Sequence, residues 1–310
     1  MRNANASSRN RAIDNHVGRQ FSIADVEEAL TRVDSGAPLE RQLAYAKSEA
    51  SRVHLTLRRL PSGDDGKRLL DVGICAQWIG AYVNLLGYRD ITGIALEEGF
   101  GTGKTLPKKN LPDFALAIDF LDAEKEPFPY PDASFDVVVC CSMLEHLVLD
   151  PMHMMSEISR VTKAGGLLCL QTPNSASLGT LKRALLGRQQ PASYSPYFAI
   201  DIHRHNREYT PSELSRVAQA GGFEIASVDT FIQISPAWQR WVMTMLAFAA
   251  AQAGACPLRF RGERAMVCGR KKTPVVNRWP SWLYENPWLD EGWYRAHGAL
   301  GKRRLDEWRS

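Results

Sequence analysis

The sequence predicts an α/β fold: a three-layer, Rossmann-like architecture with a seven-stranded, mostly parallel sheet and helices on both faces. Short apolar runs alternate with longer helical segments, which is typical of strand–helix–strand units. The run at 135–141 carries a single charge near its start, as expected for a strand buried on both faces. A helical segment at 152–162, a Gly-Gly break and a second apolar run at 167–170 follow. These two strands are therefore expected to be parallel.

Two parts of the chain precede the first strand. Residues 1–20 are rich in Asn, Ser and Arg and show no periodicity, so we expect them to be disordered. Residues 21–66 are expected to hold two helices. The first begins at Ser22, with Asp25 completing a short capping box, and the second covers 39–60.

The predicted Rossmann-like domain spans residues 67–271. Pro211 opens a helix that ends at Ala220, because Gly221 and Gly222 follow it as a C-terminal cap. The seven strands are expected at 69–72, 91–95, 114–121, 135–141, 167–170, 223–228 and 265–269.

The composition argues against several classes of function. A net charge of +4 is too small to predict a nucleic-acid partner, and we expect none. The six cysteines lack a Cys-x-x-Cys spacing and most fall in or beside predicted core elements. This usage favours a reducing, cytoplasmic location over a disulfide framework. The longest apolar run, 241–253, is too short to span a bilayer, so no transmembrane segment is expected.

Residues 272–310 form a basic extension that holds five of the eight tryptophans. The extension either presents a basic aromatic surface to an anionic partner or a membrane face, or docks its rings on the domain. The tryptophans lack a regular helical spacing, and aromatic rings are costly to leave in water. We therefore favour docking.

Five motifs follow one another along the predicted domain. They are KRLLDVG (67–73), GYRDITGIAL (87–96), LDAEKEPFPYPDASFDVVVCCSMLEHL (121–147), EISRVTKAGGLLCLQTPN (157–174) and HNREYTPSELSRVAQAGGFEI (205–225). Their order resembles that of class I S-adenosylmethionine-dependent methyltransferases, in particular the bacterial small-molecule O-methyltransferases with FD-V-LEH and REYTP-EL signatures. The resemblance covers about residues 67–271. It implies an enzyme that transfers a methyl group from S-adenosylmethionine to an oxygen of a small-molecule or glycan-type acceptor.

The resemblance also implies a cofactor pocket at the carboxyl ends of the strands. Gly73 would let the cofactor approach the backbone closely, ahead of a helix that starts near Ala76. Asp122 would accept the adenine amine, and Cys141 with Ser142 would line the methionine arm. The implied cofactor-binding residues are Asp71, Gly73, Glu97, Asp122, Ala123, Cys141 and Ser142.

The chain departs from the family pattern at two places. Gly73 lacks the further glycines that usually follow it, and the side chains of Cys75 and Gln77 are expected to crowd the path of the cofactor. Ala95 ends the second strand, where an acid normally accepts the ribose hydroxyls, and Glu97 follows two residues later. A second hypothesis is therefore a non-catalytic, methyltransferase-like binding or scaffold protein. A nicotinamide dehydrogenase is disfavoured because the chain lacks GxGxxG.

His146 is the first candidate catalytic residue. It is either a general base poised near neutral pH or, together with Glu145, a cap for its turn. Related quinol O-methyltransferases take magnesium ligands from a similar turn that carries a further Glu three positions earlier. That position is Ser142 here, so no metal site is expected.

The loop DIHRHNREY at 201–209 holds the other candidate catalytic residues. His203, His205 and Tyr209 occupy alternating positions, which share a direction if the segment is extended. The loop is either a lid that offers bases and anion contacts to the acceptor, or a solvated loop with Tyr209 packed against the following helix.

Two segments, 175–210 and 236–254, are expected to cover the acceptor side of the domain. The helix at 236–253 is apolar on nearly every face. It therefore covers an apolar acceptor, forms a homodimer interface, or is buried in its own domain.

Overall fold

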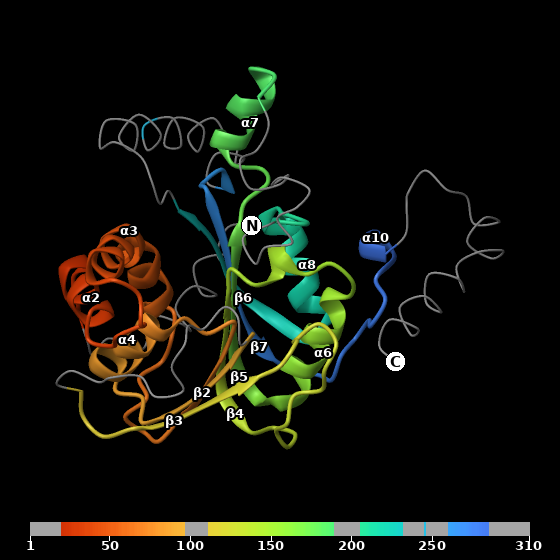
Figure 1. Ribbon diagram of the computed structural model, residues 1–310. Helices are drawn as coiled ribbons and strands as arrows, with labels where there is room; N and C mark the ends of the chain where they lie inside the picture. The colour runs from red at the N-terminus through yellow and green to blue at the C-terminus, as the bar shows by residue number, and fades with distance from the viewer. Residues whose placement is uncertain (1–19, 97–110, 189–204, 232–244, 246–259, 285–310) are drawn as a thin grey trace, which may run out of the picture.

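The computed structural model describes residues 20–96, 111–188, 205–231, 245 and 260–284 of the 310-residue chain (Figure 1). In these residues the strands form one seven-stranded sheet in the order β3-β2-β1-β4-β5-β7-β6. Strands β1 to β5 pair in parallel, and β7 is antiparallel to both β5 and β6. The strands are β1 (Arg68–Val72), β2 (Asp90–Ala95), β3 (Ala115–Phe120), β4 (Phe135–Cys141), β5 (Thr162–Pro173), β6 (Phe223–Phe231) and β7 (Arg264–Lys271). The predicted fold class is confirmed.

Helices cover both faces of this sheet (Figure 1). One face carries α2 (Ile23–Leu30), α3 (Leu39–Leu57) and α4 (Ala76–Leu86), and the other carries α6 (Pro151–Val161) and α8 (Pro211–Ala220). Val137 and Val139 of β4 pack in the first core, whereas Val138 and Cys140 pack in the second. This burial on two sides explains why β4 is a continuous apolar run and not an alternating one.

The predicted helices and strands that fall within the described residues are confirmed, with differences at their ends. The second N-terminal helix ends at Leu57 instead of residue 60. Strand β5 extends well beyond the predicted 167–170, because Thr162 already pairs with Phe135 across a register shift. The first residues of β5 include a lysine and two glycines. These residue types are uncommon in strands, so the sequence did not predict the start of β5.

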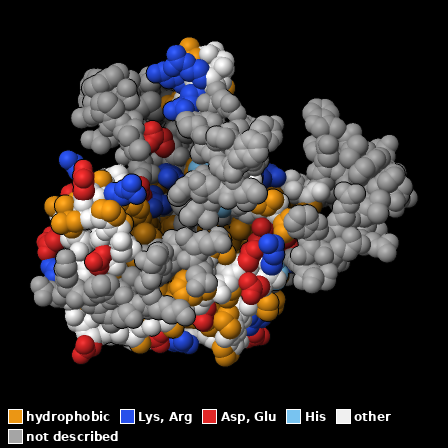
Figure 2. Space-filling view, in the orientation of Figure 1, with side chains coloured by type: hydrophobic (Ala, Val, Ile, Leu, Met, Phe, Trp, Pro, Cys, Tyr) orange, Lys and Arg blue, Asp and Glu red, His pale blue; other side chains and the backbone are white. Residues whose placement is uncertain are grey.

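Helix α7 (Leu178–Leu185) has no counterpart among the predicted elements. Ser177 caps it by accepting a hydrogen bond from the N–H of Thr180, and none of its residues is buried. It carries Lys182 and Arg183, and Figure 2 shows basic side chains gathered over this helix. Because α7 has no buried face, the pattern of core residues could not reveal it.

The N-terminal helices are part of the layer that covers the sheet. The predicted capping box is present. Ser22 Oγ accepts a hydrogen bond from the N–H of Asp25, and the carboxylate Oδ2 of Asp25 accepts one from the N–H of Ser22 at 2.6 Å. A Cβ atom at Gly80 of α4 would lie 2.2 Å from the carbonyl oxygen of Ala29. The backbones of α2 and α4 therefore touch at this glycine.

The described part of the C-terminal extension docks on the domain. Asp150, fully buried ahead of α6, accepts hydrogen bonds from both Nη atoms of Arg278 and from the hydroxyl of Tyr284. Trp282 of α10 (Ser281–Tyr284) lies against Arg216 of α8, whose Cζ is 4.2 Å from the ring centroid. These contacts agree with the docking interpretation. The three remaining tryptophans of the extension lie outside the described residues.

Several predictions concern residues that the structure does not describe. The expected disorder of residues 1–20 and the helix at 236–253 fall outside it, apart from residues 20 and 245. The domain boundaries stay predictions. No helix in the described part of the chain combines the length and the hydropathy that a membrane span requires.

Asp71 lies in β1 with only 3% of its surface exposed. Its Oδ2 atom accepts a hydrogen bond from the hydroxyl of Tyr82 at 2.9 Å. Burial raises the pKa of Asp71 to about 7, and it outweighs the opposing effects of the Tyr82 hydrogen bond and of the Arg52 charge. The carboxyl group therefore holds its proton far more tightly in the folded chain than in the unfolded chain.

The free energy of unfolding should consequently fall as the pH rises from about 4 to about 7, because only the folded chain keeps the Asp71 proton over this interval. This contribution should disappear in Asp71→Asn, whose amide does not titrate. Between the two ends of the interval, the wild-type protein should lose on the order of 4 kcal/mol more than the variant. Urea denaturation of both proteins at each end measures the difference, and equal losses would contradict the raised pKa.

Candidate active site

The carboxyl ends of β1, β4 and β5 meet at one edge of the sheet, where ligands bind in parallel α/β folds. Cys141 ends β4 beside Gln171 of β5. Gly73 follows β1 with φ +82°, and α4 begins at Ala76 as predicted. A Cβ atom at Gly73 would lie 3.2 Å from the Sδ atom of Met143. A larger residue would therefore strain this turn and press on Met143.

Gln77 does not crowd this edge, and that prediction is wrong. Its Nε2 atom donates to the carbonyl oxygen of Gln42 at 3.1 Å and to that of Leu30 at 3.4 Å. The side chain points toward the N-terminal helices because their carbonyl groups need a buried donor. Cys75 also faces α3, where its thiol is hydrogen-bonded to Tyr45, and burial raises the pKa of this thiol. Whether Cys75 crowds the cofactor stays a prediction.

Two arginines converge on the hydroxyl of Ser142, which follows β4 with φ +54°. Arg52 of α3 donates from Nη1 to Ser142 Oγ at 2.7 Å and to Gln171 Oε1 at 3.3 Å. Arg264, the first residue of β7, donates from Nη1 to the same hydroxyl at 3.1 Å. Positive charge from two distant segments thus meets at a residue predicted to line the methionine arm.

Acidic side chains accompany both guanidinium groups. Burial acts to lower the pKa of Arg52, but the charge of its ion-pair partner Glu49 keeps that pKa above its usual value. Arg264 lies 3.9 Å from Glu145, and burial and the charge of Arg52 lower the pKa of Arg264. Both guanidinium groups stay charged at neutral pH.

Arg52 and Arg264 are absent from the site predicted from the sequence. A signal for Arg52 exists, because Glu49, Arg52 and Thr56 recur at helical spacing and the latter two are buried. A charge on a buried helical face is unusual and points to a partner. Arg264 offers no such signal, since the antiparallel return of β7 brings it to the edge.

The predicted adenine side is a tight turn after β3. Asp122 Oδ1 accepts from the N–H of Glu124 at 2.9 Å, and Oδ2 pairs with Lys125 Nζ at 2.9 Å. Ala123 is fully buried in the core on the α6 side of the sheet. Glu97 lies outside the described residues. The assignment of these residues to cofactor binding stays a prediction.

The structure brings two of the candidate catalytic histidines together. The ring centroids of His146 and His205 are 5.0 Å apart, with an interplanar angle of 74°. His146 belongs to the short 3₁₀ helix η1 (Leu144–His146). Asn206 joins the two segments: its N–H donates to Glu145 O and its Nδ2 donates to His146 O, each at 2.8 Å. His203 lies outside the described residues.

Tyr209 lies in the core on the α6 side and is 2% exposed. Burial raises the pKa of its hydroxyl. Arg207 covers the ring, with Cζ 5.2 Å from the centroid. This placement favours the packing alternative for Tyr209, and its catalytic role stays a prediction.

Glu145, His146 and His205 together are residue types that bind metal ions. One donor atom of each lies within 4.8 Å of the other two. The expectation that no metal binds here rests on the turn at 142–146 alone. His205 comes from a separate segment, so this expectation leaves out a third donor.

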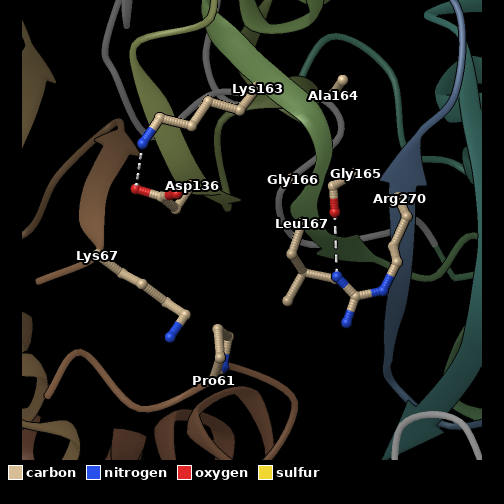
Figure 3. Close-up of a pocket in the computed structure, with 9 residues that line it drawn as sticks. All are labelled: Pro61, Lys67, Asp136, Lys163, Ala164, Gly165, Gly166, Leu167 and Arg270. Carbon is tan, nitrogen blue, oxygen red and sulfur yellow. Dashed lines mark hydrogen bonds and ion pairs between the residues drawn. The ribbon is translucent and has the colours of Figure 1, made fainter. Parts of the chain in front are cut away.

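A pocket of about 210 Å³ lies at the opposite, amino-terminal edge of the sheet (Figure 3). Most of its charged side chains contact groups within the pocket: Lys163 Nζ pairs with Asp136 Oδ2 at 2.8 Å, and Arg270 Nη1 donates to Gly165 O at 3.1 Å. None of the predicted site residues lines it. This pocket is therefore separate from the candidate active site.

Comparison with known proteins identifies the family. A model of the methyltransferase domain matches residues 70–170. The ubiquinone biosynthesis O-methyltransferase of Aromatoleum aromaticum is 30% identical over 169 residues, which cover 54% of this chain and 68% of that protein. The enzyme of the same name from Idiomarina loihiensis is 30% identical over 176 residues. The match covers 54% of this chain and 65% of that protein, so the chain spans just under two thirds of this relative.

A solved structure agrees with the fold. It is a chain of the complex between the Haloferax volcanii Trm112 methyltransferase activator and a methyltransferase, and it superimposes with a TM-score of 0.51 at 14% identity. The match covers 83% of this chain and 100% of that chain. Fold, motif order and relatives thus agree, and this chain belongs to the class I S-adenosylmethionine-dependent methyltransferases.

Proposed function

We propose that this chain is an active methyltransferase that transfers a methyl group from S-adenosylmethionine to an oxygen of a small-molecule or glycan-type acceptor. The observation that carries the proposal is the similarity to O-methyltransferases at about 30% identity. The domain match at 70–170 includes Gly73, Asp122 and Ser142, which line or adjoin the carboxyl-terminal edge.

The residues of this edge fit the cofactor on two grounds. Gly73 has no side chain, and a Cβ atom there would lie 3.2 Å from the Sδ atom of Met143. The lack of a side chain at this turn lets a ligand approach the backbone closely. The Arg52 guanidinium suits the carboxylate of the amino-acid portion of the cofactor. When bound, S-adenosylmethionine supplies a methyl group attached to a positively charged sulfur.

The contribution of the protein to methyl transfer is positioning and proton removal. Cys141 and Ser142 would hold the methionine arm in line with the acceptor oxygen, and alignment of this kind supplies much of the rate enhancement. An imidazole nitrogen of His146 or His205 would accept the proton of the acceptor hydroxyl. Glu208 Oε1 lies 2.9 Å from Nδ1 of His205, so the accepting atom of His205 would be Nε2.

The acceptor would contact the segments at 175–210 and 236–254. Within the first, α7 exposes Leu181 and Leu185, the latter at 88%, which supports contact with an apolar acceptor or partner. The segment at 236–253, which the sequence predicts to be an apolar helix, would provide a homodimer interface. We infer no nucleic-acid partner and a cytoplasmic location from the net charge and the cysteine usage.

Isothermal titration with S-adenosylmethionine and with S-adenosylhomocysteine tests cofactor binding. We expect saturable binding with one site per chain. If neither compound releases or absorbs heat at millimolar concentration, the methyltransferase proposal fails.

The variant Arg52→Gln should bind S-adenosylhomocysteine about 10- to 100-fold more weakly, because it loses charge-assisted hydrogen bonds to the ligand carboxylate. Arg59→Gln is the matched control. Arg59 is also on the α3 side and also ion-paired, but its partner at 2.8 Å is Asp229 of β6, which is not a residue of the candidate site. Equal affinities of the two variants would show that Arg52 does not bind the cofactor. Far-UV circular dichroism checks that both variants are folded.

The competing function is a non-catalytic binding or scaffold protein. It is favoured by Ala95, which offers no carboxylate for the ribose, and by the side chain of Cys75 in the cofactor turn. The double variant Cys75→Gly, Ala95→Asp separates the two functions. If the chain is an active methyltransferase, its affinity for S-adenosylhomocysteine should change only modestly, by less than about 10-fold. Binding that appears only in the double variant would support the non-catalytic alternative.

A further inference from the structure

We propose that the pocket at the amino-terminal edge of the sheet binds a phosphate group, carried either by inorganic phosphate or by a small phosphate ester (Figure 3). Its volume is about 210 Å³, whereas pockets for drug-sized compounds usually measure about 300–1,000 Å³. The pocket therefore suits a small ion or ester. None of the residues that line it belongs to the candidate active site, so this inference goes beyond the methyltransferase function.

The charges that line the pocket favour an anion. The cationic side chains are those of Lys67, Lys163 and Arg270, and the carboxylate is that of Asp136. They come from the residue ahead of β1, the start of β5, the end of β7 and the start of β4, in that order. Three positive charges against one negative charge leave the lining positive. A partly enclosed site with an excess of one charge attracts ligands of the opposite charge.

The carboxylate of Asp136 is engaged by Lys163. Its Oδ2 atom accepts a hydrogen bond from Lys163 Nζ at 2.8 Å and another from the backbone N–H of Arg68 at 3.0 Å. Burial acts to raise the pKa of Asp136, but these hydrogen bonds and the charges of Lys163 and Lys67 lower it below its usual value. Asp136 is thus ionised at neutral pH and balances the charge of Lys163, which leaves Lys67 and Arg270 to attract the ligand.

Lys67 has an ion-pair partner that a phosphate can replace. Its Nζ atom lies 2.6 Å from Asp65 Oδ2, and the side chain of Asp65 is 81% exposed. An ion pair so close to water is weak, because water and dissolved salt screen it. The ammonium group of Lys67 is therefore available to a dianion in the pocket.

Arg270 approaches from the other side of Leu167 (Figure 3). Its Nη1 atom donates to the carbonyl oxygen of Gly165 at 3.1 Å. A carbonyl group is neutral, so this bond orients the guanidinium without cancelling its charge. The acid opposite Arg270 on β6 is Glu224, which pairs with Lys272 at 3.4 Å. A planar guanidinium held in this way suits two oxygens of one phosphate.

The turn at 163–166, at the start of β5, fixes the carbonyl group that orients Arg270. Gly165 has φ +75°, and a Cβ atom at Gly166 would lie 2.8 Å from the carbonyl oxygen of Lys163. A side chain would strain the backbone at the first position and collide with it at the second. The Gly-Gly break of the sequence therefore shapes one wall of the pocket.

Calorimetric titration of the full chain with sodium phosphate tests the site. The protein is first dialysed into a buffer without phosphate or sulfate, and sodium chloride keeps the ionic strength constant so that screening does not vary. We expect one site per chain with a Kd of about 1 mM or lower. Failure to saturate at about 10 mM phosphate would overturn the proposal.

Two further compounds locate the site and its ligand. S-adenosylhomocysteine should leave the affinity for phosphate unchanged, because a cofactor binds at the opposite edge of the sheet. Loss of phosphate binding in its presence would place the ion in the cofactor site and overturn the proposal. Glycerol 3-phosphate is the second probe: tighter binding than that of inorganic phosphate identifies an ester as the ligand, and weaker binding identifies the free ion.

Two variants that each remove one positive charge test the assigned residues. Lys67→Gln and Arg270→Gln should each weaken phosphate binding about 10-fold or more, because each loses a charge-assisted contact with the ion. Lys182→Gln is the control, since it removes the same charge from the exposed helix α7, outside the pocket, and it should bind as the wild type does. Wild-type affinity in both pocket variants, or an equal loss in the control, would overturn the site.

Asp136→Asn tests the same site in the opposite direction. The variant removes the negative charge of the lining, while its amide oxygen still accepts the N–H of Arg68, so phosphate should bind about 3- to 10-fold more tightly. Partial unfolding cannot produce such a gain. Weaker binding in a variant whose circular dichroism matches that of the wild type would contradict an anion site in this pocket.

Discussion

Burial of the central strands on both faces is the constraint on which the rest of this structure depends. Residues of β4 alternate between two cores, one under α2, α3 and α4 and the other under α6 and α8. Neither face can then accommodate a polar ligand, because groups there have no access to water. Polar chemistry is confined to the ends of the strands, and the carboxyl-terminal edge is where the chain places the candidate active site.

This edge contains charges that only several elements together can satisfy. Arg52 comes from α3, Arg264 from β7, and Glu145 from the short helix after β4. Buried charges are stable only when paired and hydrogen-bonded. The N-terminal helices are therefore part of the site, since α3 carries Arg52 and the Gln77 amide joins α4 to the carbonyl groups of α2 and α3.

Much of the fold could be predicted because its signals are local. The apolar runs located the seven strands of the described residues. The capping box at Ser22 marked the start of one helix, and the Gly-Gly pair after Ala220 marked the end of another. The exposed helix α7 was not predicted because it has no buried face, and so no pattern of apolar residues marks it. The start of β5 was not predicted because it contains a lysine and two glycines, which are uncommon in strands. The side-chain direction of Gln77 was equally hidden, since carbonyl groups far along the chain decide it.

The sequence by itself determined the fold class, the order of the strands along the chain and the family, because periodicity and motif spacing are properties of neighbouring residues. Only the tertiary structure decided which side chains share the edge. It joined Arg52, Ser142 and Arg264, and it placed His205 beside His146 through the hydrogen bonds of Asn206. Contacts between distant segments depend on how the layers pack, and no local pattern records that packing.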